Sequence, residues 1–181
     1  MTAVNGLTYA DYTALPNDGK RYEILDGVLH VAATPGRTHQ RVVLRLAGAL
    51  DAHVTAHDVG EIEIAPFDVI LSDPNVVEPD IIFVATERMP SFSSRGFEGA
   101  PTLVVEVLSP SSARIDRNTK LQIYGRHGVP YYWIVEPEER AIDVHFLAGS
   151  SYGTPARFVG DLVDLAPFSG LRLDPAVIWP R

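Results

Sequence analysis

A chain of 181 residues that is 46% hydrophobic and 21% charged can bury one well-packed core but is short for two domains. The absence of cysteine excludes disulfides, thiolate metal sites and cysteine nucleophiles. The formal net charge of −8 argues against a protein dedicated to coating DNA, because phosphate contacts require many Lys and Arg. No apolar run approaches the length of a membrane span, and the N-terminus lacks a basic region followed by a hydrophobic core. We therefore expect a cytoplasmic protein without a membrane partner.

The first third of the chain carries signals for a short helix, a hairpin and a long helix. Thr8 can cap a helix that Pro16 closes. Asp26-Gly27 lies between the β-rich arms RYEIL and VLHVAA and suits the type I′ turn of a β-hairpin. Thr38 can cap the long helix, which has an apolar stripe at helical spacing. The stripe consists of Val42, Val43, Leu46, Ala49 and Leu50.

The middle of the chain contains most of the expected sheet. GEIEI, DIIFVA and LVVEVL are predicted strands, and the last two are mostly apolar and therefore buried. Residues 86–101 lie between those two strands and are polar and rich in Gly and Ser, which predicts a surface loop and a candidate flexible flap. After Pro110-Ser111-Ser112 a helix runs until Gly128, and YYWIV and AIDVHFL complete the sheet.

These elements predict a single α/β domain with a restriction endonuclease-like arrangement, in which helices flank a central mixed β-sheet and a hairpin precedes it. Residues 1–36 supply the first helix and the hairpin, residues 37–147 the core, and residues 148–181 a C-terminal extension that ends in proline-rich coil. Charge is uneven along the chain. Between Arg88 and Arg126 there are six basic and three acidic residues, a net of +3.

Two acidic residues occur where buried strands are expected. Asp80 opens DIIFVA and Glu106 interrupts LVVEVL, although charges inside buried strands are rare unless they are paired or bind a metal. Lys120 lies on the following helix, and Asp116 and Tyr124 share its face at a spacing of four residues. If the two strands are neighbours, a tight return of the chain aims Lys120 at Glu106. Two carboxylates and one ammonium would then converge.

Carboxylate oxygens with open water positions suit Mg²⁺ or Mn²⁺, which can make hydroxide near neutral pH while a lysine orients the attacking water. A simpler interpretation is also open, because Pro-Asp can merely begin a strand and Glu106 can form a buried pair with Lys120. That pair requires the same geometry as the metal site. With one lysine balancing two acids, we expect Asp80→Asn to leave the metal-free fold as stable or slightly more stable.

The strings EPDIIFV, LVVEVLSPSS, DRNTK and GVPYYWIVEP, in this order, resemble the PD-(D/E)XK nuclease superfamily and within it the Uma-type endonuclease family. The resemblance extends from about Leu7 to Leu147 and includes the hairpin and the helix that starts near His39. It implies a metal-dependent endonuclease that hydrolyses phosphodiester bonds in DNA. Asp80 and Glu106 would hold the metal, and Lys120 would position or help deprotonate the water.

One departure from the superfamily concerns the lysine. The superfamily places it two residues after the acidic strand residue, where this chain has Leu108, and Lys120 from the helix substitutes as it does in the Uma-type branch. Glu23 and His39 match positions that the branch shares, and they are candidates for a further ligand or a general base.

A second function is compatible with the same residues: a catalytically silent module of this fold that acts through dimerisation or protein contacts. The expected partners are DNA, through a local contact, and a second copy of the chain in a homodimer. Arg114 and Arg117 could grip phosphates, although a solvated helix face explains them nearly as well. His53 and His57 have the spacing of a metal pair, but no third ligand is evident, and solvated histidines are the better interpretation.

Overall fold

The computed structural model describes residues 6–180 and contains two mixed β-sheets. The larger sheet has seven strands, in which β9 and β10 run parallel and the other pairs run antiparallel. Six of them follow the order β12-β11-β10-β9-β6-β3, and β13 pairs with β11. The strands are β3 (Gly60–Ile64), β6 (Ile81–Ala85), β9 (Leu103–Val107), β10 (Tyr131–Glu136), β11 (Ala141–Ala148), β12 (Ser151–Tyr152) and β13 (Ala156–Val159). The predicted central mixed sheet is therefore confirmed.

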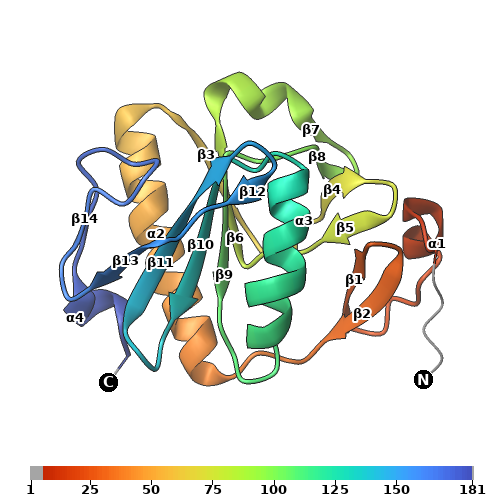
Figure 1. Ribbon diagram of the computed structural model, residues 1–181, viewed down its shortest axis with the longest axis horizontal. Coiled ribbons are helices and arrows are strands. Elements are labelled where there is room, and N and C mark those ends of the chain that lie inside the picture. The colour runs from red at the N-terminus through yellow and green to blue at the C-terminus, as the bar shows by residue number, and fades with distance from the viewer. Residues whose placement is uncertain (1–5, 181) are drawn as a thin grey trace.

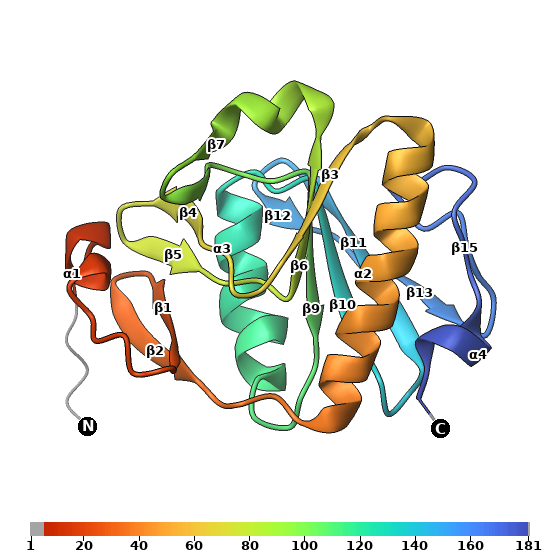
Figure 2. The same ribbon diagram turned by 180° about the vertical axis from the view of Figure 1, so that it is seen from behind.

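Two helices cover opposite faces of the larger sheet (Figures 1 and 2). α2 (Arg37–His57) packs on one face, where its apolar stripe meets Ile81, Leu103 and Val105. α3 (Leu121–Arg126) packs on the other face, against the alternate residues of the same strands. Because side chains alternate along β9, Glu106 points to the α3 face.

The predicted hairpin is confirmed, and it belongs to the second sheet. Asp26 and Gly27 both have positive φ, 52° and 75°, as a type I′ turn requires. The strand order is β2-β1-β5-β4-β8-β7, which joins the hairpin to two later segments of the chain. The strands are β1 (Arg21–Leu25), β2 (Val28–Ala32), β4 (Val69–Ser72), β5 (Asn75–Val77), β7 (Phe92–Ser93) and β8 (Gly96–Glu98). β2 is an edge of this sheet.

The predicted loop over residues 86–101 is wrong for residues 86–98, which fold into regular structure. They form the 3₁₀ helix η1 (Thr86–Ser91) and the hairpin of β7 and β8, and β8 pairs in parallel with β4. Phe97 anchors the segment in the core at 1% exposure, with the ring of Phe92 5.2 Å from its own. Aromatic burial outweighs the polar composition of the segment.

Two element ends differ from the sequence prediction. Helix α1 (Tyr9–Thr13) begins after Thr8 as expected, with a capping box to Asp11. Helix α2, in contrast, begins after Gly36, so Thr38 lies within its first turn and does not cap it. No helix among residues 6–180 is long and apolar enough to cross a membrane.

The C-terminal segment packs into the core, and a strand pair and a short helix precede its last described residues, Trp179 and Pro180. β14 (Leu162–Val163) pairs with β15 (Arg172–Leu173), and the short helix α4 (Pro175–Ile178) follows. Their apolar side chains join the cluster between the larger sheet and α2. The buried members are Leu162, Leu165, Phe168, Leu171, Leu173, Ile178 and Trp179.

Candidate active site

Three elements bring the predicted site residues to one cavity. Asp80 directly precedes β6, Glu106 lies in β9, and Lys120 ends the π-helical turn η2 (Ile115–Lys120) that leads into α3. In the antiparallel pair of β6 and β9, Ile81 faces Val105, so the next step of the register places Asp80 beside Glu106. All three side chains are buried, with 5%, 3% and 4% of Asp80, Glu106 and Lys120 exposed. They line a cavity of about 150 Å³.

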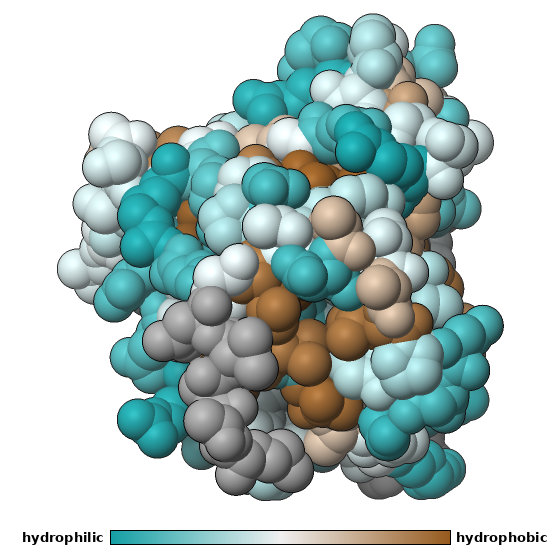
Figure 3. Space-filling model, turned by 90° about the vertical axis from the view of Figure 1, so that its right-hand side faces the viewer, coloured by the Kyte–Doolittle hydropathy of each residue, from teal (hydrophilic) through white to brown (hydrophobic). Residues whose placement is uncertain are grey.

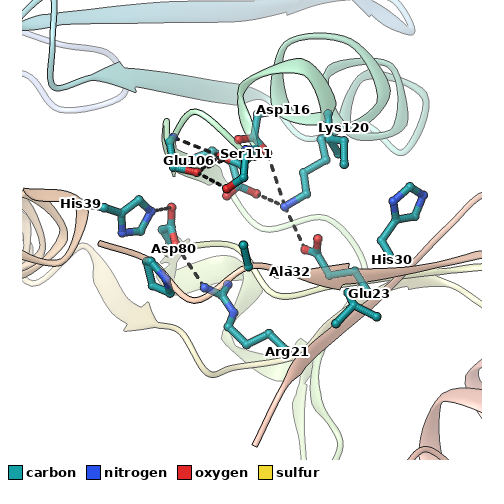
Figure 4. Close-up of a pocket in the computed structure, with 16 residues that line it drawn as sticks. Arg21, Glu23, His30, Ala32, His39, Asp80, Glu106, Ser111, Asp116 and Lys120 are labelled. Carbon is teal, nitrogen blue, oxygen red and sulfur yellow. Dashed lines mark hydrogen bonds and ion pairs between the residues drawn. The ribbon is translucent and has the colours of Figure 1, made fainter. Parts of the chain in front are cut away.

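Lys120 contacts three carboxyl groups (Figure 4). Its Nζ lies 2.9 Å from Oε1 of Glu106, 2.9 Å from Oε1 of Glu23 and 3.6 Å from Oδ1 of Asp116. The hydroxyl of Tyr124 donates to the same Oε1 of Glu106 at 2.9 Å. The expected approach of Lys120 to Glu106 is therefore present, and so is the shared face of Asp116, Lys120 and Tyr124. Glu23 reaches the group from the hairpin strand β1.

Asp80 has a separate set of partners. Its Oδ2 accepts hydrogen bonds from the backbone N–H of Val107 at 2.9 Å and lies 3.0 Å from Nε2 of His39, on the first turn of α2. Its Oδ1 lies 3.5 Å from the guanidinium of Arg21, which also pairs with Glu78. These contacts hold the carboxylate between the two sheets.

Arg21 and Asp116 were not assigned to the site from the sequence. Arg21 stands two residues before Glu23 on a strand, so the alternation of side chains could have placed the two on one face. The expectation that one lysine balances the acids is wrong, because Arg21 and His39 also contact Asp80. These contacts could not be predicted because they depend on tertiary structure, and the alternation of side chains along a strand does not show which sheet the hairpin joins.

The electrostatics of Glu106 and Lys120 follow from burial among several acids. Burial raises the pKa of Glu106 to about 8; Lys120 opposes the shift, and the nearby carboxyls of Asp116, Asp80 and Glu23 add to it. Burial alone would lower the pKa of Lys120, but the surrounding carboxylates outweigh it and hold that pKa well above its usual value. At neutral pH Lys120 is an ammonium. Without a bound metal ion, the carboxyl cluster of Glu23, Glu106 and Asp116 retains a proton.

Asp80 behaves in the opposite way. Burial tends to raise its pKa, but the hydrogen bond and charge of His39, the Val107 N–H and the charge of Arg21 together lower it. The stability expectation for Asp80→Asn therefore loses its basis, since the folded protein favours the ionised form of this residue.

The donor set suits a hard divalent cation. The hydrogen bonds to Glu106 from Lys120 and Tyr124 both go to Oε1, so its Oε2 is available to a cation. The hydrogen bonds to Asp80 both go to Oδ2, and a cation at its Oδ1 would share that oxygen with the guanidinium of Arg21, which lies 3.5 Å away. Within residues 6–180 no group of three or more Asp, Glu or His side chains is set to hold a metal ion. Mg²⁺ commonly binds through one or two carboxylates, with water and substrate phosphate completing its shell, so two ligands are compatible with it.

The remaining predicted residues lie outside this cavity. Arg114 is exposed, whereas Arg117 is paired with Glu136 at 2.6 Å and lines a neighbouring cavity. His57 donates a hydrogen bond from Nδ1–H to the backbone carbonyl oxygen of His53, in the last turn of α2.

Comparison with known proteins agrees with this architecture. A crystal structure titled as a putative nuclease belonging to DUF820, from Anabaena variabilis, superposes with a TM-score of 0.80 at 18% identity, over 96% of this chain and 98% of that one. The restriction endonuclease-like fold prediction is thereby confirmed. An uncharacterized protein of Synechocystis is 28% identical over 130 residues, which is 70% of this chain and 66% of that protein's length. Residues 9–176 match the family Uma2, described as "Putative restriction endonuclease". The chain therefore belongs to the Uma2 family.

Proposed function

We propose that this protein is a metal-dependent endonuclease that hydrolyses phosphodiester bonds in DNA. Membership of a family described as "Putative restriction endonuclease" supports this class of reaction. The observation that carries the proposal is the meeting of Asp80, Glu106 and Lys120, from three separate elements, at one cavity. Structural ion pairs seldom require a second buried acid beside the first, because like charges in a desolvated site repel.

The proposed role of each residue follows from its chemistry. Asp80 and Glu106 would hold Mg²⁺ or Mn²⁺, which when bound supplies an activated water and stabilises charge on the phosphate. Lys120 is held as an ammonium, so it donates hydrogen bonds and orients a water or a phosphate oxygen without taking the proton. His39 and Arg21 fix the Asp80 carboxylate, and Glu23 and Tyr124 fix the positions of Lys120 and Glu106.

Metal binding has a direct thermodynamic test. Mn²⁺ or Mg²⁺ is expected to raise the melting temperature of the wild-type protein, because a ligand of the folded state stabilises it by about 2.7 kcal/mol at one hundred times its Kd. For a chain of this size each kcal/mol corresponds to about 2–4 °C. Glu106→Gln should remove the increment, and Glu61→Gln, on the edge strand β3, should keep it. No metal-dependent shift in the wild type at millimolar metal would contradict the site.

Contact with DNA is expected to come from the basic segment between Arg88 and Arg126. Binding measured in Ca²⁺ should weaken with salt, with a log–log slope on the order of −3 to −5. Arg114→Glu should weaken binding without unfolding the protein, because its side chain makes no ion pair within residues 6–180. Arg172→Glu, the same charge change in the exposed part of β15, is the matched control. Equal loss in both variants would exclude a specific role for Arg114.

One observation favours the alternative, a catalytically silent module that acts through dimerisation. Lys120 is saturated by carboxylates and is 4% exposed, as in a purely structural ion cluster. The edge strand β2 carries Val31 at 53% exposure, and Figure 3 shows apolar side chains gathered on the side of the molecule that carries the hairpin. A wild-type protein that dimerises but neither binds Mn²⁺ nor cuts DNA would support this function.

A further inference from the structure

The cavity lined by Asp80, Glu106 and Lys120, which we call the catalytic cavity, is too small for a whole nucleotide. Its volume of about 150 Å³ lies below the range of about 300–1,000 Å³ that small-molecule sites occupy. It has room for a phosphate group and water beside Asp80, Glu106 and Lys120. If a phosphate reacts there, the sugar and base attached to it must lie in an adjoining space.

A second cavity adjoins the first at His39 and Ser109, which line both. It measures about 420 Å³ and opens between the first turn of α2 and the segment that follows β9. We call it the Arg37 cavity, after the exposed arginine at its rim. Figure 4 places His39 next to Asp80, so the two cavities meet beside a proposed metal ligand.

The lining of the Arg37 cavity combines apolar surfaces with polar groups. Leu108, Pro110, Ala113 and Pro137 supply the apolar part, and the polar part includes Glu138 and the Arg117–Glu136 ion pair. At the rim, Arg37 makes no ion pair within residues 6–180 and leaves its guanidinium free for a ligand. A nucleobase has apolar faces and hydrogen-bonding edges, and it packs well against such a combination.

A third cavity, of about 400 Å³, shares His39 and Asp80 with the catalytic cavity but is less suited to a base. Its lining includes the acidic groups of Glu78 and Asp80 and the polar side chains of Asn17, Lys20 and Gln40. Unlike the Arg37 cavity, this cavity is lined by Asp80 itself, so a base bound there would crowd the proposed metal site.

We propose that the Arg37 cavity binds the nucleobase of an unpaired nucleotide whose phosphate lies in the catalytic cavity. This inference rests on the proposed nuclease function and adds a substrate class, single-stranded or locally unpaired nucleic acid. The base must be unpaired because one that remains stacked and paired has no free face to insert. The depth of the site leads to the same conclusion, since at most 5% of Asp80, Glu106 and Lys120 is exposed.

The test uses ligands that contain no phosphodiester bond, so its result does not depend on cleavage. Binding of deoxyadenosine and thymidine 5′-monophosphates, in Ca²⁺, is compared by calorimetry with binding of deoxyribose 5-phosphate, which lacks the base. The nucleotides are expected to bind at least tenfold more tightly. Ala113→Phe fills the Arg37 cavity and should reduce that ratio to twofold or less. The control Ala56→Phe adds the same side chain at an exposed position of α2 and should leave the ratio unchanged.

Arg37→Ala tests the same cavity without adding volume, and it should weaken nucleotide binding severalfold even if Ala113→Phe does not fold. Equal affinity for nucleotide and sugar phosphate in the wild type would overturn the inference, as would full nucleotide binding by both cavity variants. Cleavage distinguishes this failure from failure of the proposed function. If duplex DNA is cut as fast as single-stranded DNA and binding does not depend on the base, the inference is wrong but the proposed nuclease function stands. If binding depends on the base and this dependence is lost in Ala113→Phe, but no DNA is cut, the base-binding cavity stands and the proposed nuclease function is wrong.

Discussion

Replacing Lys120 with methionine is expected to destabilise the folded protein by about 3–5 kcal/mol at pH 8, the usual consequence of removing one partner from a buried ion pair. Lys120 is the cation that lies among Glu23, Glu106 and Asp116. Without it these buried carboxyls must protonate or repel one another. Because protonation relieves the repulsion, the loss should be smaller at pH 5 than at pH 8. Cleavage of DNA should fall to background at both pH values.

The matched control is Lys20→Met, which makes the same chemical change at a lysine that is 58% exposed and paired with Asp18. Such exposed pairs contribute little, so this variant should stay close to the wild type. Urea unfolding in EDTA measures both variants. The double variant of Lys120→Met with Glu106→Gln should recover part of the lost stability, because it removes one of the stranded acids. An unchanged unfolding midpoint for Lys120→Met would mean that the cluster is not formed, and undiminished cleavage would remove Lys120 from the site.

The elements with strong local signals could be predicted from the sequence. Asp26-Gly27 identified the hairpin because both residues favour positive φ, and the buried strands were evident from their apolar runs. The approach of Lys120 to Glu106 followed from a tight return between a strand and a helix. The same local information did not give the exact start of α2, since Gly36 occupies the N-cap position and has no side chain to cap the helix.

What could not be predicted depends on contacts between distant segments. The second sheet requires β4 to pair with β8 and β1 to pair with β5, and no local pattern specifies either pairing. The composition of residues 86–101 predicted a loop. The segment folds into regular structure because Phe97 is buried in the second sheet, and composition does not show that burial. The charge balance of the site failed for the same reason: Arg21 reaches Asp80 only once the hairpin has paired with β5, which ends shortly before Asp80 in the chain.

Asp80→Asn and Glu106→Gln are expected to change the stability of the metal-free protein in opposite directions at pH 8. Asn at position 80 removes a carboxylate that the fold stabilises, and hydrogen bonds to a charged group contribute about 1.5–3 kcal/mol. Gln at position 106 resembles the protonated carboxyl and keeps an oxygen that can accept from Lys120 and Tyr124. Glu106→Gln should therefore be neutral at pH 5 and stabilising at pH 8. Both variants should lose cleavage.

The pH dependence follows from the raised pKa of Glu106, which is about 8 in the folded protein against an ordinary value of 4.5. Between these values the folded protein holds a proton that the unfolded chain has released, so wild-type stability in EDTA should fall as pH rises through this window. At about 1.4 kcal/mol per pKa unit the fall has an upper limit of about 5 kcal/mol, shared across the coupled acids. Glu106→Gln should flatten this decline. Asp80→Asn should keep most of it, because it removes only one of the nearby carboxyls that add to the effect of burial on the pKa of Glu106. Urea titrations from pH 5 to pH 9 measure both slopes, and a wild-type curve that rises with pH would show that Glu106 is ionised in the folded protein.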